Sequence, residues 1–122
     1  MKNIMYLTIL MSIITNINSF SQAKIRYLVT SSPETDGWGV VEITFTNETG
    51  GSEEIEVRSD KLPWSKTIYN FPKGEVASVQ AYKSYNCGKC DVTTTIFKNG
   101  KKEKSETSRG NSPMSTATAY IY

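Results

Sequence analysis

The sequence contains no histidine among its 122 residues. This absence excludes the Ser-His-Asp and Cys-His catalytic arrangements, and it removes the commonest protein ligand of transition metals. With only two cysteines, a single chain cannot complete a tetrahedral zinc site either. We therefore expect a protein that is not an enzyme, holds no metal and needs no cofactor.

A large excess of charge of one sign is also lacking. The formal net charge is +2, and Lys2 contributes one of those charges from the N-terminal end. Charged residues make up 21% and hydrophobic residues 38% of the chain, a balance typical of a globular protein with room for one domain. A chain so close to neutral gives no electrostatic reason to expect a nucleic-acid partner.

Long hydrophobic runs are confined to the N-terminus, where residues 4–17 read IMYLTILMSIITNI. This run follows Lys2, precedes small and polar residues, and is shorter than the ~20 residues of a membrane-spanning helix. It predicts a signal peptide at 1–22, cleaved between Ser19 and Ala23, and a mature domain at 23–122. An uncleaved N-terminal anchor is the alternative. The ending SFSQA resembles leaders of Gram-negative bacteria, so we expect an exported protein, periplasmic or extracellular, with no stable membrane span after cleavage.

Beyond the leader, short segments alternate apolar and polar residues, the pattern of half-buried strands. Val41, Ile43 and Phe45, for example, alternate with Glu42 and threonines. Segment 53–62 also permits a helix, although its isolated β-branched residues favour a strand. With breakers between the segments, the pattern predicts an all-β, immunoglobulin-like antiparallel β-sandwich of about 7–8 strands, or less readily a small barrel. The expected strands are 24–31, 40–47, 53–62, 64–71, 75–84, 91–98, 101–108 and 114–122.

The same pattern predicts core residues and a hairpin. Asn99 and Gly100 suit a two-residue type I′ turn, because both central positions of that turn need positive φ. The segment after this turn has no apolar residue, so we expect an edge strand protected by its lysines. The side chains expected in the core are Trp64, Val41, Ile43, Phe45, Val79 and Ile96.

Cys87 and Cys90 have the spacing of a redox motif, CGKC. A redox-active pair usually lies at a helix N-terminus, but here the motif runs directly into a predicted strand. In an exported protein the pair predicts a local structural disulfide. A redox-active pair and a metal or intermolecular role are the alternatives.

Two groups of residues are candidates for binding. Tyr82 and Tyr85 follow one another near the end of a predicted strand, and Lys101 and Lys102 begin the lysine-rich edge strand. The tyrosines could form part of a ligand-binding patch, and the lysines could bind an acidic partner or a glycan. Ordinary strand composition and edge protection explain the same residues without any ligand.

Four segments together resemble the soluble domain of the MmpS family of small transport-accessory proteins. They are ITFTNETG, LPWSKTI at 62–68, VASVQAY at 76–82 and DVTTTIFKNGK at 91–101. The resemblance implies an immunoglobulin-like sandwich outside the cytoplasmic membrane that assists a lipid or siderophore exporter. Members of that family usually keep an N-terminal membrane helix, and their cysteines lie in the strand that corresponds to 91–97 and near the C-terminus. Here the leader has the features of a cleaved one, and both cysteines precede that strand.

The sequence thus predicts an exported, non-enzymatic β-sandwich that acts through protein or surface contacts, including as an accessory to an envelope transport complex. Its expected partner is a protein of the cell envelope. One alternative is a module that binds a small ligand, a lipid or a glycan. A second alternative is a periplasmic redox protein that uses Cys87 and Cys90.

Overall fold

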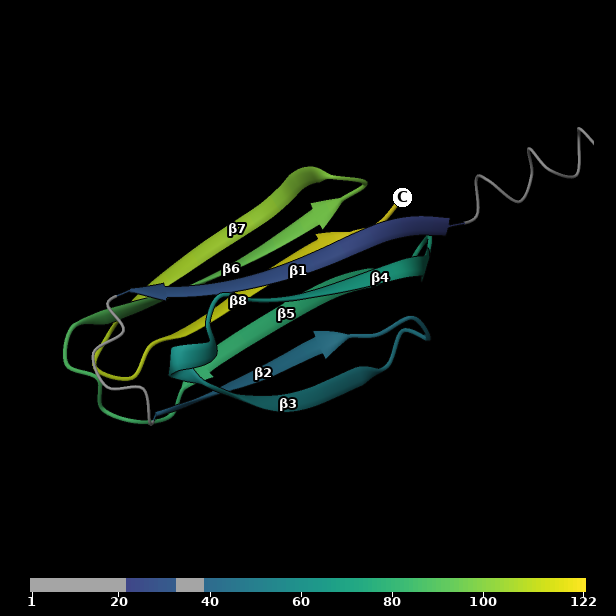
Figure 1. The fold of residues 1–122 in the computed structure, drawn as a ribbon. Helices are drawn as coiled ribbons and strands as arrows, with labels where there is room; N and C mark the ends of the chain where they lie inside the picture. The colour runs from purple at the N-terminus through teal and green to yellow at the C-terminus, as the bar shows by residue number, and fades with distance from the viewer. Residues whose placement is uncertain (1–21, 33–38) are drawn as a thin grey trace, which may run out of the picture.

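The computed structural model describes residues 22–32 and 39–122 (Figure 1). All of the predicted signal peptide at 1–22 except its last residue lies outside the described part, and cleavage and export stay predictions. Gln22, at the end of the predicted leader, is already the first residue of a strand.

The described chain contains eight strands and one short 3-10 helix. They are β1 (Gln22–Ser32), β2 (Val40–Thr46), β3 (Ser52–Arg58), η1 (Ser59–Lys61), β4 (Trp64–Pro72), β5 (Val76–Lys83), β6 (Cys90–Lys98), β7 (Lys101–Gly110) and β8 (Met114–Tyr120).

The strands form two antiparallel sheets of four strands that stack face to face (Figure 1). The first sheet has the order β4-β1-β6-β7 and the second has the order β3-β2-β5-β8. This arrangement confirms the predicted all-β antiparallel sandwich. The barrel alternative is wrong, because the described strands form two separate sheets.

Only two connections stay within a sheet, and both are short hairpins. One joins β2 to β3 and the other joins β6 to β7. At the second hairpin Asn99 and Gly100 have φ values of 51° and 85°, and Lys98 pairs with Lys101 across them. The predicted Asn-Gly turn is confirmed, as is the edge position of β7, which pairs with β6 alone.

The core lies between the sheets and follows the alternation of the strands. On β1, Ala23, Ile25, Tyr27 and Val29 are all buried, while the residues between them face outward. The buried residues of β2, β5, β6 and β8 alternate in the same way, since one face of each strand packs against the opposite sheet. They include Val41, Ile43, Phe45, Ala77, Val79, Ala81, Val92, Ile96 and Ala117.

Besides shifts of one or two residues at strand ends, two features differ from the sequence prediction. Strand β3 ends at Arg58 and the chain continues as a 3-10 turn, so the predicted strand over 53–62 is too long and its helical alternative is wrong. In β4 both Ile68 and Phe71 are buried, although simple alternation assigns them to opposite faces. The pairing of β1 with β4 shifts register between Ala23 and Ile25, and this bulge turns Phe71 into the core.

Buried hydrogen bonds connect the two sheets at two places. The Tyr27 hydroxyl, on β1, donates to the main-chain oxygen of Thr46 on β2 at 2.8 Å. Elsewhere the hydroxyls of Thr94 on β6 and Ser115 on β8 are 2.9 Å apart, and Ser115 also donates to the main-chain oxygen of Glu106 at 2.8 Å. These bonds satisfy polar groups that burial would otherwise leave unpaired.

The two long sides of the sandwich differ. On one side β7 packs against β8, and the Ser115–Glu106 hydrogen bond joins these strands across the sheets. On the other side the edge strands are β3 and β4, where Ile55, Val57 and Trp64 are only partly buried against the core. The sandwich is therefore closed along β7–β8 and more open along β3–β4.

Candidate functional site

Cys87 lies in the loop that carries the chain from β5 in the second sheet to β6 in the first, and Cys90 is the first residue of β6. Cys87 and Cys90 form a disulfide, with their Cα atoms 6.0 Å apart. The main-chain N–H of Cys87 donates to the main-chain oxygen of Asn111, in the connection between β7 and β8, at 2.9 Å. The element that follows is strand β6, so no helix N-terminus is present to stabilise a Cys87 thiolate. This geometry is that of a local cross-link at the start of a strand.

The sequence-predicted binding residues do not come together. Tyr85 lies at the end of the sandwich where its carbonyl accepts a hydrogen bond from Ser112, and Tyr82 is close to it at the end of β5. Lys101 and Lys102 begin β7 at the opposite end. The two pairs therefore cannot contact one small ligand.

Tyr82 and Tyr85 also have different surroundings. Tyr82 is half-buried on the outer face of the second sheet, paired with Met114 of β8. The Tyr85 ring packs so closely on Gly39 that a Cβ at position 39 would overlap it, and the Lys83 ammonium lies 5.9 Å from the ring centre. Tyr85 is thus a packing residue of the loop region, whereas Tyr82 faces outward.

Five of the six residues expected in the core, namely Val41, Ile43, Phe45, Val79 and Ile96, have exposed fractions of 4% or less. Trp64 is different, because it is only partly buried at the margin of the core. Its ring centre lies 5.6 Å from that of Phe45. At the start of edge strand β4, Trp64 covers the more open side of the sandwich.

The outer face of the second sheet carries most of the large apolar side chains that stay exposed. We call the outward-facing residues of β5 and β8 the β5–β8 face. Of the five large hydrophobic side chains exposed in the described part, Val76, Met114 and Tyr120 lie on this face and Tyr122 directly follows it. Val76 pairs with Tyr120 across the two strands. The rings of Tyr120 and Tyr122 pack edge to face, with their centres 4.8 Å apart.

The β5–β8 face continues into carboxylates on the neighbouring strands. The antiparallel register places Glu56, Glu42, Tyr82 and Met114 in one row across β3, β2, β5 and β8. Between the two apolar ends of the face lie hydroxyl and amide side chains such as Ser78 and Thr118, whose hydroxyls are 3.3 Å apart. The surface is therefore mixed, with exposed aromatic rings beside acidic side chains.

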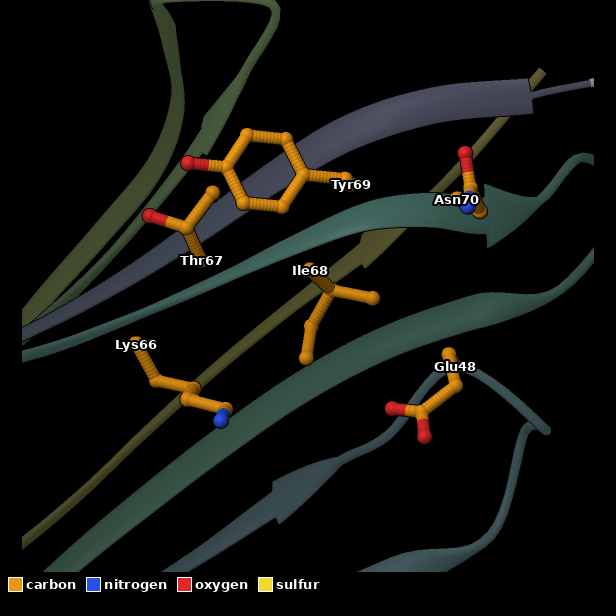
Figure 2. A pocket seen from close by; sticks show the side chains of 6 residues that line it. All are labelled: Glu48, Lys66, Thr67, Ile68, Tyr69 and Asn70. Carbon is orange, nitrogen blue, oxygen red and sulfur yellow. The ribbon is translucent and has the colours of Figure 1, made fainter.

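A shallow pocket of about 270 Å³ lies along edge strand β4 (Figure 2). Its lining residues are Glu48, Lys66, Thr67, Ile68, Tyr69 and Asn70. Figure 2 shows Lys66, Ile68 and Glu48 on one side of β4, and Thr67 and Tyr69 on the other. The Lys66 ammonium lies on one side of Ile68 and the Glu48 carboxylate lies on the other. This arrangement could hold a small ligand that carries one positive and one negative charge.

The described ranges show no metal centre. Residues 22–32 and 39–122 contain no group of three or more His, Cys, Asp or Glu side chains placed to hold a metal ion. Burial raises the pKa of Tyr27 well above its ordinary value, but its hydroxyl is part of the core. Within the same ranges no helix has the length and apolar character needed to cross a membrane.

No protein-family model matches the chain, and no curated protein is similar to it. The resemblance to the MmpS family therefore stays a prediction that rests on the four sequence segments.

Proposed function

We propose that this chain is a non-enzymatic β-sandwich that acts by binding a protein partner through the β5–β8 face. The observation that carries the proposal is the concentration of exposed Val76, Met114, Tyr120 and Tyr122 on and beside this one face. Exposed apolar and aromatic side chains that gather on one surface are typical of protein interaction sites.

The chemistry of the face also indicates the kind of partner. Tyr82 and Tyr120 offer rings with polar tips, which are enriched in protein interfaces. Glu42 and Glu56 lie in the same row as Tyr82. A partner with an apolar centre and a basic margin would complement this arrangement. If the leader is cleaved as predicted, this partner is a protein of the cell envelope, such as a subunit of a transport complex.

Site-specific photo-crosslinking in intact cells tests the proposal. A photoreactive residue replaces Thr118, which is exposed on the β5–β8 face, and in a matched control it replaces Thr107, exposed on the outer face of the first sheet. Each threonine forms a cross-strand hydroxyl pair, so the two replacements perturb the sheets to similar degrees. We expect a discrete protein adduct from position 118 alone.

The double variant Val76→Ser with Tyr120→Ser should abolish that adduct while leaving the circular dichroism spectrum unchanged, because both side chains are exposed. An adduct formed equally from positions 107 and 118, or one that survives the double variant, would contradict the assignment to this face. Failure to obtain any adduct from position 118 would count against a stable protein partner.

The pocket along β4 supports a second candidate, a module that binds a small ligand. Its volume of about 270 Å³ is just below the range of typical small-molecule sites, ~300–1,000 Å³. Native mass spectrometry of protein isolated from its own cells would reveal a retained ligand. A ligand whose retention is lost in Lys66→Glu but not in Thr118→Ala would favour this candidate. The redox alternative predicts insulin reduction by the isolated protein, and inactivity in that assay excludes it.

A further inference from the structure

The charges of the sandwich are separated between its two sheets. The strands of the first sheet carry eight basic and three acidic side chains, a net charge of +5. The strands of the second sheet carry four acidic and two basic side chains, a net charge of −2. The near-neutral total therefore conceals an electrostatic polarity across the thickness of the molecule.

Two edge strands carry net charges of opposite sign, −2 on β3 and +2 on β7. Strand β3, at one edge of the second sheet, carries the exposed carboxylates of Glu53, Glu54 and Glu56. Strand β7, at one edge of the first sheet, carries four exposed basic side chains, Lys101, Lys102, Lys104 and Arg109, with two glutamates. Each strand pairs with a neighbour on one side only. At the outer edge of β7 the Glu106 main-chain oxygen accepts a hydrogen bond from Ser115, so the contact proposed below rests on the charged side chains of the two strands.

Charges on an edge strand normally prevent sheets of different molecules from joining. Protection by charge works between edges of the same sign, because like charges repel. In this molecule the two edges have opposite signs, so β3 repels β3 and β7 repels β7, whereas β3 and β7 attract. The charges that prevent β3–β3 and β7–β7 contacts between copies therefore favour a contact between β3 of one copy and β7 of another.

The two edges face away from each other in one molecule. Strand β7 packs against β8, and β8 is the far end of the second sheet from β3. One copy thus cannot satisfy its own β3 with its own β7. A pair of copies that joins one β3 to one β7 leaves a free β3 at one end and a free β7 at the other, which is head-to-tail association without closure.

We propose that copies of this chain associate head to tail, the acidic β3 edge of one copy binding the basic β7 edge of the next. The exposed apolar side chains of the β5–β8 face take no part in this contact, although Glu56 borders both surfaces. The tests below use the purified chain alone, so their outcome does not depend on the proposed function. The contact is weak and reversible, because solvent-exposed ion pairs contribute little individually. It becomes significant where the protein is concentrated, as at a surface.

Salt dependence is the first test. Sedimentation equilibrium of the purified chain is measured over a range of protein concentrations at low and high ionic strength. The Debye length falls from about 30 Å at 0.01 M salt to about 3 Å at 1 M. We expect the average mass to rise continuously with protein concentration at low salt, and to return to that of the monomer at high salt. A monomer at every concentration in low salt would overturn the proposal.

Charge reversal is the sharper test. Glu54→Lys with Glu56→Lys makes both edges basic, and Lys102→Glu with Lys104→Glu makes both acidic. Each double variant alone should associate at least about tenfold more weakly than the unmodified chain, because attraction becomes repulsion. An equimolar mixture of the two should associate again, since every basic edge then finds an acidic one.

A matched control separates edge contacts from overall charge. Glu48→Lys with Glu75→Lys changes the net charge by the same amount, but both residues lie in turns outside β3. This control should stay within about twofold of the unmodified chain, because β3 is intact. Equal loss in the control, or failure of the mixture to associate, would refute the assignment to β3 and β7. Circular dichroism of each variant verifies that the sandwich is folded.

Discussion

Tyr27 belongs to β1 in the first sheet, and its hydroxyl donates to the Thr46 carbonyl of the second sheet at 2.8 Å in the buried core. Replacement of Tyr27 by Phe keeps the ring and removes this one donor. A buried carbonyl then loses its partner, while the packing of the ring against Phe45, 5.8 Å away, is retained. At neutral pH we expect Tyr27→Phe to lower the free energy of unfolding by about 1 kcal/mol.

The difference in unfolding free energy between the unmodified protein and Tyr27→Phe should depend on pH. Burial raises the pKa of Tyr27 well above its ordinary value of about 10. Below pH 10 the tyrosine is neutral in both folded and unfolded chains, so its ionisation has no effect on stability. Above pH 10 the unfolded chain releases the proton and the folded chain does not. The unmodified protein therefore loses about 1.4 kcal/mol of stability per pH unit through this group.

The Phe variant lacks this loss, because it has no hydroxyl at position 27 to ionise. The stabilities of the two proteins should thus converge above pH 10 and cross near about pH 11, beyond which the variant is the more stable. Contributions from lysines and from the other tyrosines are common to both proteins and cancel in the difference. The described chain has no free cysteine, so thiol exchange does not interfere at alkaline pH.

Urea unfolding followed by far-ultraviolet circular dichroism, at intervals from pH 7 to pH 11.5, measures both curves. Equal m-values, the slopes of the unfolding free energy against urea concentration, would show that the two unfolded states are comparable. A stability difference that stays constant across this pH range would refute the reasoning, because it would mean that Tyr27 ionises as easily in the folded protein as in the unfolded one.

Three further substitutions test the packing, each by urea unfolding. Ser115→Ala should cost about 2 kcal/mol, because it leaves the Thr94 hydroxyl and a main-chain carbonyl unsatisfied; a cost below about 0.5 kcal/mol would contradict this hydrogen-bond chain. Gly39→Ala should lower the free energy of unfolding by about 1–3 kcal/mol, because the new methyl group overlaps the Tyr85 ring. The addition of Tyr85→Ala removes the ring, so Gly39→Ala should then cost little. An equal cost in both backgrounds would contradict the overlap. Trp64→Ala should cost about 2 kcal/mol, less than the 3–5 kcal/mol of a fully buried aromatic residue. A full 3–5 kcal/mol for Trp64 would mean that its ring is covered in solution.

The sequence predicts strands well where a strict two-residue alternation meets a clear turn. The segments around Ile43, Val79 and Ala117 each place every second residue in the core. The Asn99-Gly100 turn is readable for the same reason, since few other residue pairs accept positive φ at both positions. These features depend on neighbours in the chain, and local chemistry is enough to specify them.

Other features depend on partners far away in the chain. The inward turn of Phe71 follows from a register shift between β1 and β4, which no pattern within β4 can reveal. The hydroxyl pair of Thr94 and Ser115 forms because β6 and β8 face each other across the core. The alternation places Thr94 in line with Val92 and Ile96, and Ser115 in line with Ala117, on the inner faces of their strands. Only the packing of the sheets shows that the two hydroxyls satisfy each other.

The candidate interaction surfaces also depend on strands that are far apart in the sequence, so local patterns do not predict them. Tyr82 is identifiable from the sequence, but only the pairing of β5 with β8 places Met114 beside it at one end of the face and Tyr120 beside Val76 at the other. Net charge gave no reason to expect an electrostatic contact, because sequence order interleaves acidic and basic segments. Sheet order places Glu54 and Lys102 on opposite sides of the sandwich, and this separation is invisible in a sum over the chain.

The position of β1 has a consequence for how the protein acquires its structure. The first strand of the domain is an inner strand, hydrogen-bonded to β4 on one side and to β6 on the other. During synthesis or translocation from the N-terminus, β1 emerges first and waits for both of its partners. Such non-local pairing slows folding and makes it depend on the late part of the chain. We therefore expect the domain to fold only after β6 has emerged. If the predicted leader directs export, this delay would keep the chain unfolded during its passage.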